Sequence, residues 1–254
     1  MKKALSILLV LVMALAVFTG CGGGDSDDAA KTYVIATDTV FAPFEFTNEA
    51  GKFVGIDVDI LAAVAEDQGF QYDLQSLGFD AAVAALESSQ ADGVIAGMSI
   101  TEARMLKYDF SEAYYDSTVC AAVKADSTAA SLDDIKGSAV AVKNGTQSAA
   151  WAESIAEEYA LELTYFDDSA MMYQAVLSGN AVACFEDHPV MAYGVAQGNG
   201  MKLLVEEAGD YATPYGFAVL KDQNTELLEM FNAGLANIKA NGKYDEIVNS
   251  YLAA

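Results

Sequence analysis

Short apolar or β-branched runs alternate along this sequence with longer runs of helical periodicity, and this alternation restricts the possible fold more than any other feature. Thr32–Thr37 and Ala181–Phe185 are typical of buried strands, whereas Ile60, Leu61 and Val64 recur at the spacing of one helix face. Strands that alternate with helices in this way favour parallel sheets with helices on both faces. We therefore predict an α/β fold.

Three loops that follow predicted strands carry polar or aromatic side chains, at residues 38–44, 97–104 and 143–148. In open α/β sheets, ligands bind beyond the C-terminal ends of the strands. We therefore expect these three loops to form a binding site. After residue 30, no stretch is long and apolar enough to span a membrane, which takes about 20 apolar residues.

The charge of the chain excludes two classes of partner. Its 37 acidic residues outnumber its 13 lysines and arginines, which gives a formal net charge of −24. Such a protein is repelled by nucleic-acid phosphates and by anionic membrane surfaces, so we expect no nucleic-acid partner. The 254 residues suffice for one large or two modest domains, each with its own core.

The N-terminus has the pattern of a secretory signal. Two lysines precede an apolar stretch at residues 5–18, and the following Phe18-Thr19-Gly20-Cys21 resembles a bacterial lipobox. We predict a lipoprotein signal peptide at residues 1–20, lipidation of Cys21, and a flexible lipid-anchored tether at residues 21–31. The protein would then be extracytoplasmic and anchored to the cell membrane. The alternative is an ordinary signal peptide cut nearby, with Cys21 as a free thiol.

Two further cysteines, Cys120 and Cys184, lie in apolar runs that are predicted strands. An even number of cysteines in an oxidising compartment favours a disulfide. Two buried free thiols agree equally well with the same runs, and the sequence leaves both possibilities open.

Six segments carry a resemblance to a known family. Their order and spacing resemble the motifs of the polar-amino-acid family of periplasmic solute-binding proteins of ABC transporters. The segments are residues 37–46, 55–60, 96–104, 109–115 and 142–146, together with Asp187. The similarity runs from about Tyr33 to the C-terminus, and within the family the sequence most resembles the glutamine-binding proteins.

The resemblance implies a two-lobe periplasmic-binding-protein fold of type II, with two chain crossings at the hinge. The crossings are expected near residues 114–119 and 213–217. The first lobe would comprise residues 32–115 and 214–254, and the second lobe residues 116–213. The resemblance further implies a monomeric, non-enzymatic substrate-binding lipoprotein of an ABC importer, whose partners are an amino acid and the transporter's membrane subunits. No cofactor and no metal are expected.

The charges of a free amino acid define what such a site needs. Burying a zwitterion requires a partner for each charge, since unpaired buried charge is very costly. Arg104 suits the α-carboxylate because its guanidinium can pair with both oxygens, and Ser99 and the amide of Thr146 can add donors. For the α-ammonium, the expected partners are Asp187 and the carbonyl of Gly97.

The resemblance also implies ligand contacts beyond the zwitterion. Phe41 and Phe79 would enclose the aliphatic stem of the ligand, and Asp38 and Lys143 would bind its distal group. A carboxylate accepts from an amide NH2 and an ammonium donates to an amide oxygen, which fits glutamine. An additional acid, Glu186, precedes Asp187 and would favour a basic ligand such as lysine, arginine or histidine, which is the alternative substrate class.

Two other functions are considered. The same fold serves as a periplasmic cyclohexadienyl dehydratase, whose chemistry needs a general acid and base in the cleft. Glu186 and His188 are the extra candidates for that role. A sensor module acting through a separate partner is a further possibility. Asp57 and Asp59 resemble a metal-binding pair, but acids in the first turn of a helix explain them better.

Overall fold

The computed structural model describes residues 31–205, 208 and 211–252. The predicted signal peptide, the lipidation site at Cys21 and nearly all of the predicted tether lie outside the described residues. Within the described part, every helix is too short or too polar to cross a membrane.

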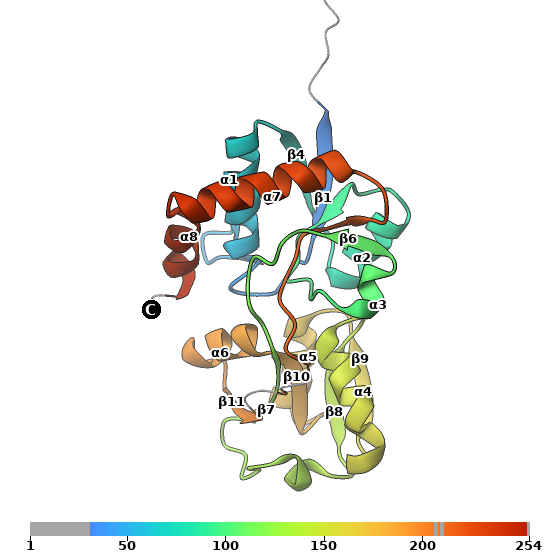
Figure 1. Cartoon of the computed structure of the whole chain (residues 1–254). Coiled ribbons are helices and arrows are strands. Elements are labelled where there is room, and N and C mark those ends of the chain that lie inside the picture. Colours follow the sequence, from blue (N-terminus) through green and yellow to red (C-terminus); the bar gives the residue numbers. More distant parts are fainter. Residues whose placement is uncertain (1–30, 206–207, 209–210, 253–254) are drawn as a thin grey trace, which may run out of the picture.

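The first lobe is built on a five-stranded sheet of order β4-β1-β5-β12-β6 (Figure 1). Its strands are β1 (Thr32–Thr37), β4 (Gln71–Ser76), β5 (Gly93–Val94), β6 (Tyr108–Phe110) and β12 (Ala218–Leu220), and a small hairpin adds β2 (Phe46–Thr47) and β3 (Phe53–Val54). Its helices are α1 (Ile56–Gln68), α2 (Phe79–Glu87), α3 (Glu102–Met105), α7 (Thr225–Ala240) and α8 (Lys243–Leu252). Residues of α1, α7 and α8 pack on one face of the sheet, and residues of α2 pack on the other.

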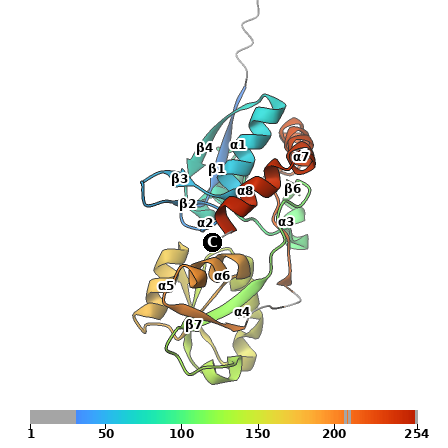
Figure 2. The same cartoon turned by 90° about the vertical axis from the view of Figure 1, so that its left-hand side faces the viewer.

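The second lobe is built on a second five-stranded sheet, of order β11-β7-β10-β8-β9. Its strands are β7 (Val119–Lys124), β8 (Ala139–Lys143), β9 (Glu162–Phe166), β10 (Ala183–Asp187) and β11 (Met201–Val205). Its helices are the 3-10 turn η1 (Leu132–Ile135), α4 (Gln147–Tyr159), α5 (Ser169–Leu177) and α6 (His188–Ala196). Residues of α4 cover one face, and residues of α5 and α6 cover the other. Figure 2 shows the two lobes one above the other.

The sheets are mixed, so the prediction of parallel sheets was wrong in part. β12 runs antiparallel to β5 and β6, and β7 runs antiparallel to β10 and β11. The reason is the connection between the lobes. A strand that the chain enters directly from the other lobe begins at the edge where the neighbouring strands end. It therefore runs against them, whereas a crossover helix would have returned the chain to the far edge.

The chain passes between the lobes twice, and the two connections run side by side (Figure 1). Tyr115 pairs with Tyr215 in an isolated antiparallel bridge, with a hydrogen bond of 2.8 Å from the Tyr215 N–H to the Tyr115 carbonyl. The Thr213 N–H donates to the Ser117 carbonyl at 3.0 Å. These bonds join the two connections into a short ribbon, which forms the hinge.

Both cysteines of the second sheet are buried free thiols. Cys120 lies in β7 opposite Glu186, and Cys184 lies in β10 opposite Ala122. Burial raises the pKa of the Cys184 thiol well above its usual value. Of the two possibilities left open by the sequence, the structure therefore has two free thiols, and their burial makes them unreactive.

Candidate ligand-binding site

A cavity of about 10 Å³ lies between the lobes, beyond the ends of β1, β5, β8 and β10. Its lining residues are Phe41, Phe79, Ala96, Gly97, Ser99, Arg104, Lys143, Thr146, Gln147 and Asp187. Eight of these ten were predicted from the sequence, and the remaining predicted residue, Asp38, is bonded to Lys143. A cavity of this size holds about one water molecule. The two lobes are thus closed upon each other around the predicted residues.

Arg104 connects the lobes across this cavity. Thr101 caps the short helix α3 by accepting a hydrogen bond from the Arg104 N–H at 3.2 Å. The guanidinium donates to the Ser99 carbonyl at 2.8 Å and, across the cleft, to the Gly145 carbonyl at 2.9 Å. Its central carbon lies 5.3 Å from the centre of the Phe79 ring. Burial lowers the pKa of Arg104, and the nearby carboxylate of Asp187 opposes this effect.

Asp187 presents a buried carboxylate at the end of β10. One of its oxygens accepts a hydrogen bond from Ser148 at 2.7 Å, and the other accepts one from Tyr215 at 2.6 Å. Burial raises the pKa of Asp187, and the donors Tyr215 and Ser148 counteract that rise. Because Tyr215 belongs to the hinge ribbon, the carboxylate is attached to both the second lobe and the hinge.

Asp38 and Lys143 form an ion pair between the lobes. Asp38 follows β1 and Lys143 ends β8, and their side chains are only 1% and 2% exposed. The Lys143 ammonium donates to Asp38 Oδ2 and lies 4.6 Å from the centre of the Phe41 ring and 5.8 Å from that of Phe79. Burial alone would lower the pKa of Lys143, but Asp38 and Glu186 outweigh it and raise the pKa.

Two residues of the sequence, Gly145 and Thr146, shape the turn after β8. Gly145 adopts a positive φ of 71°, which reverses the chain after Lys143. Thr146 then caps α4 by accepting a hydrogen bond from the Ala149 N–H at 3.2 Å. This sequence of turn and cap places Lys143, Thr146 and the first turn of α4 against the first lobe.

Glu186 does not line the cavity. Its Oε2 accepts hydrogen bonds from Ser169 at 2.7 Å and Tyr173 at 2.8 Å, and its Oε1 accepts one from the Asp187 N–H at 3.0 Å. Burial raises the pKa of Glu186, while Lys143 opposes the rise. Three donors from the second lobe therefore satisfy this carboxylate.

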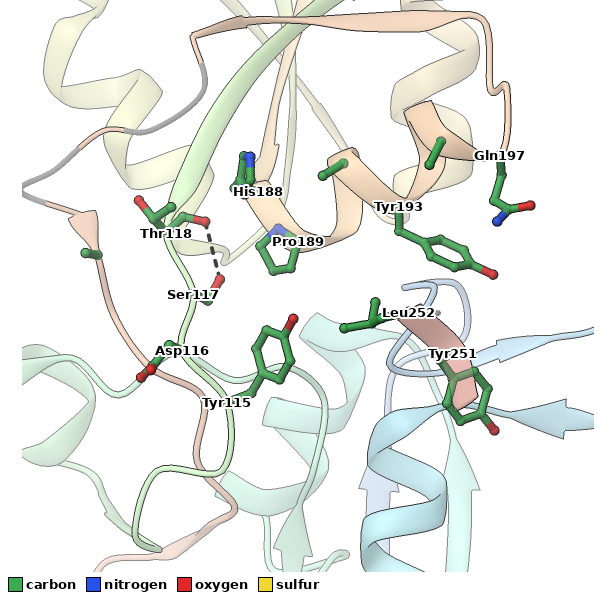
Figure 3. A pocket seen from close by; sticks show the side chains of 13 residues that line it. Tyr115, Asp116, Ser117, Thr118, His188, Pro189, Tyr193, Gln197, Tyr251 and Leu252 are labelled. Carbon is green, nitrogen blue, oxygen red and sulfur yellow. Dashed lines mark hydrogen bonds between the residues drawn. The ribbon is translucent and has the colours of Figure 1, made fainter. Parts of the chain in front are cut away.

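His188 lines a different pocket, of about 580 Å³, between the hinge, α6 and the end of α8 (Figure 3). Its neighbours there include Ser117 and Thr118 of the hinge and Tyr193 of α6. Glu186 does not line this pocket, so the acid and base considered for a dehydratase do not face a common space.

Sequence reasoning missed four residues at the site. Ala96 and Gln147 line the cavity, and Ser148 and Tyr215 donate to Asp187. Gln147 and Ser148 lie in or beside the loop at 143–148, so their position was a usable signal. Nothing local in the sequence indicated Tyr215, because it reaches the site only through the pairing of the two hinge connections.

The charged side chains that line the cavity, together with Asp38, are balanced. Asp38 and Asp187 contribute two negative charges, and Lys143 and Arg104 contribute two positive charges. The site thus offers a cation and an anion at one end for a zwitterion, and a second such pair at the other end for a group with both donors and acceptors.

The chain has clear relatives. Residues 33–254 match the family of bacterial extracellular solute-binding proteins, family 3. The arginine-binding extracellular protein ArtP of Bacillus subtilis (strain 168) is 28% identical over 250 residues, which are 97% of this chain and 96% of that protein. Substrate binding domain 2 of Lactococcus lactis GlnP, in an open conformation, is 40% identical with a TM-score of 0.60, over 92% of this chain and 99% of that one. An ancestral arginine-binding protein bound to glutamine is 35% identical with a TM-score of 0.79, over 88% of this chain and 98% of that one.

Proposed function

The chain belongs to family 3 of the bacterial extracellular solute-binding proteins, as its motifs predicted, and on this basis we propose that it delivers a polar amino acid to an ABC importer. One observation carries the proposal. Arg104 and Asp187, from opposite lobes, line the same inter-lobe cavity and can pair with the two charges of a zwitterion. A few charged hydrogen bonds of about 1.5–3 kcal/mol each supply micromolar affinity.

Glutamine is the favoured substrate. The ammonium of Lys143 and the carboxylate of Asp38 offer one donor and one acceptor to the distal amide, between the rings of Phe41 and Phe79. The four charges of the site sum to zero, so a ligand without net charge leaves the balance intact. A basic ligand would add a positive charge beside Lys143, which is unfavourable in a buried site.

A basic amino acid is the alternative substrate, supported by Glu186 and by relatives described as arginine-binding. The third carboxylate lies close enough to influence the pKa of Lys143. Because three hydrogen-bond donors already satisfy Glu186 and it does not line the cavity, we give it a smaller weight than the Asp38–Lys143 pair.

Capture would proceed by closure of the two lobes. An amino acid is much larger than the cavity of about 10 Å³, so the lobes must part to admit it. We assign residues 32–115 and 214–254 to the first lobe and residues 116–213 to the second. A ligand that bridges the lobes favours the closed state, which the transporter's membrane subunits would recognise. Two solved relatives agree with lobes that move. The relative in an open conformation has the higher sequence identity to this chain, 40% against 35%, but the lower TM-score, 0.60 against 0.79 for the relative bound to glutamine.

The cellular setting follows from the predicted leader. We propose that Cys21 carries lipid, that the protein is held at the outer surface of the cell membrane as a monomer, and that residues 21–31 leave it free to reach the transporter. Mass spectrometry of the mature N-terminus tests this, and an unmodified Cys21 would contradict it.

A thermal unfolding screen tests the function. The protein from Lys31 onward, freed of bound ligand by unfolding and refolding, is heated with each of the twenty amino acids. Ligand at 100 times its dissociation constant adds about 2.7 kcal/mol, or a shift of roughly 5–10 °C. We expect the largest shift with glutamine. A shift with basic amino acids alone would favour the alternative, and no shift with any of the twenty would refute amino-acid capture.

A further inference from the structure

Glu45 and Asp57 form a buried carboxyl pair that the site described above does not use. Glu45 lies in the turn after Phe41, and Asp57 lies in the first turn of α1. Both side chains are completely buried. Among the described residues, no group donates to either carboxyl oxygen of Glu45 or to Oδ1 of Asp57. Buried carboxylates without donors are rare because their desolvation is costly.

One shared proton removes this cost. The two carboxyl groups are close enough to hydrogen-bond when one of them is protonated. Burial and the neighbouring charges of Asp57 and Asp38 raise the pKa of Glu45 well above its usual value, and Lys143 opposes the rise. Burial also raises the pKa of Asp57, to about 6, while hydrogen bonds from Gly97 and Tyr114 oppose that change. The rise is larger for Glu45, so the proton that the pair retains is assigned to Glu45.

The ionised member of the pair supports the ligand cavity. Oδ2 of Asp57 accepts a hydrogen bond of 2.8 Å from the Gly97 N–H, and Gly97 lines the cavity. Gly97 has a φ of 52°, and a Cβ at this position would lie 2.4 Å from the Phe41 ring. The peptide of Gly97 can thus take this position only as glycine, and Asp57 fixes it there.

The same oxygen also reaches the hinge. Oδ2 of Asp57 accepts a second hydrogen bond, of 2.8 Å, from the hydroxyl of Tyr114. The Tyr114 N–H in turn donates to the Tyr215 carbonyl at 2.9 Å, and Tyr215 holds the carboxylate of Asp187. One carboxylate therefore connects the wall of the cavity with both hinge connections.

We propose that Glu45 is a positioning residue in its neutral, protonated form, which donates to Oδ1 of Asp57 and so holds Asp57, Gly97 and Tyr114 in place for ligand capture. The part concerning capture rests on the function proposed above, whereas the shared proton does not. Glutamine in place of Glu45 can supply the same donor without titrating. Alanine supplies no donor and leaves Oδ1 of Asp57 unsatisfied.

Infrared spectroscopy of the unbound protein tests the proton directly. At pH 7 we expect the spectrum of the wild type minus that of Glu45→Gln to show a carboxylic-acid C=O band that shifts in D2O, and the spectrum of the wild type minus that of Glu49→Gln to show none. Glu49→Gln is the matched control, because it makes the same substitution at an exposed side chain of the same segment. A difference spectrum of the wild type and Glu45→Gln without this band would overturn the proposal whether or not any ligand binds.

Calorimetric titration with the amino acid found in the screen tests the positioning role. We expect Glu45→Gln to retain nearly the wild-type affinity, and Glu45→Ala to lose about tenfold or more, as when a buried acceptor loses its donor. The wild type should also weaken with rising pH more than Glu45→Gln does, since the ligand's own amine titrates equally in both. Equal losses in the glutamine and alanine variants, or identical pH profiles for wild type and Glu45→Gln, would overturn the role.

Discussion

Replacing Asp187 with asparagine removes one charge from the site and little else. Asparagine has nearly the same shape, and its amide oxygen can still accept from Ser148 or Tyr215, which lie 2.7 and 2.6 Å from the carboxylate oxygens. Burial raises the pKa of Asp187, so the ionised group is unfavourable in the unbound folded protein. We therefore expect Asp187→Asn to be at least as stable as the wild type without ligand.

The effect of this substitution on binding should be large. In the wild type, the ligand's ammonium would be paired with a buried carboxylate, and removing one partner of such a pair costs about 2–5 kcal/mol. The dissociation constant should thus rise from about 30-fold to a few thousand-fold, because each 1.4 kcal/mol is about tenfold. Isothermal titration calorimetry with glutamine measures this change, and thermal unfolding of the unbound protein verifies the fold.

The pH dependence gives the same prediction a second readout. As pH falls through the raised pKa of Asp187, the wild type loses its carboxylate and its affinity should decline, whereas Asp187→Asn should show no such decline. Asp80→Asn is the matched control, since it removes the same charge from an exposed residue near Gly145 at the cleft. The reasoning fails if Asp187→Asn binds nearly as well as the wild type, or if Asp80→Asn loses as much.

Three further predictions concern other charges. Lys143→Met removes the cation that pairs with buried Asp38, which should destabilise the closed state by about 3–5 kcal/mol. Opening of the lobes would expose Asp38 to water and remove this cost. Small-angle scattering should therefore show a larger radius of gyration for Lys143→Met, and adding Asp38→Asn should reverse it. Glu186→Gln should leave the calorimetric affinity for glutamine nearly unchanged but weaken any binding of arginine, and a loss for glutamine alone would contradict our placement of Glu186. Finally, urea unfolding should show that stability declines from pH 5 to pH 8. The folded state retains the proton of Glu45, and below about pH 6 also that of Asp57, whereas the unfolded state has released both. This is worth about 1.4 kcal/mol per pH unit and proton, and a flat or rising profile would refute it.

The sequence was informative where a local signal existed. The β-branched run at Thr32–Thr37 and the helical spacing of Ile60, Leu61 and Val64 led to the observed elements. The loop predicted at residues 143–148 carries Lys143 in the structure, where the Gly145 turn and the Thr146 cap form it. The three loops meet because each follows a strand that ends at the cleft, and this rule needs only the order of strands and helices.

Features that depend on distant parts of the chain could not be predicted in this way. The antiparallel direction of β7 and β12 follows from chain crossings, which leave no periodic pattern in the sequence. The donor from Tyr215 to Asp187 joins residues 28 positions apart through the hinge. The orientation of Glu186 depends on hydroxyls supplied by α5. For the same reason, the sequence alone could not distinguish a glutamine site from one for a basic amino acid.

The buried thiols of Cys120 and Cys184 make the second lobe observable by itself. A protein that starts at Lys31 contains these two cysteines and no others, and both are in the central strands of one sheet. A thiol reagent can modify them only when that sheet opens. The labelling rate therefore reports how often the second lobe opens. If the two lobes unfold together, a ligand that binds both lobes will slow labelling by the same factor by which it stabilises the whole protein against unfolding. If the second lobe can open while the first remains folded, the ligand will slow labelling by less than the factor by which it stabilises the whole protein in urea unfolding. The ratio of these two factors then measures how strongly the unfolding of the two lobes is coupled.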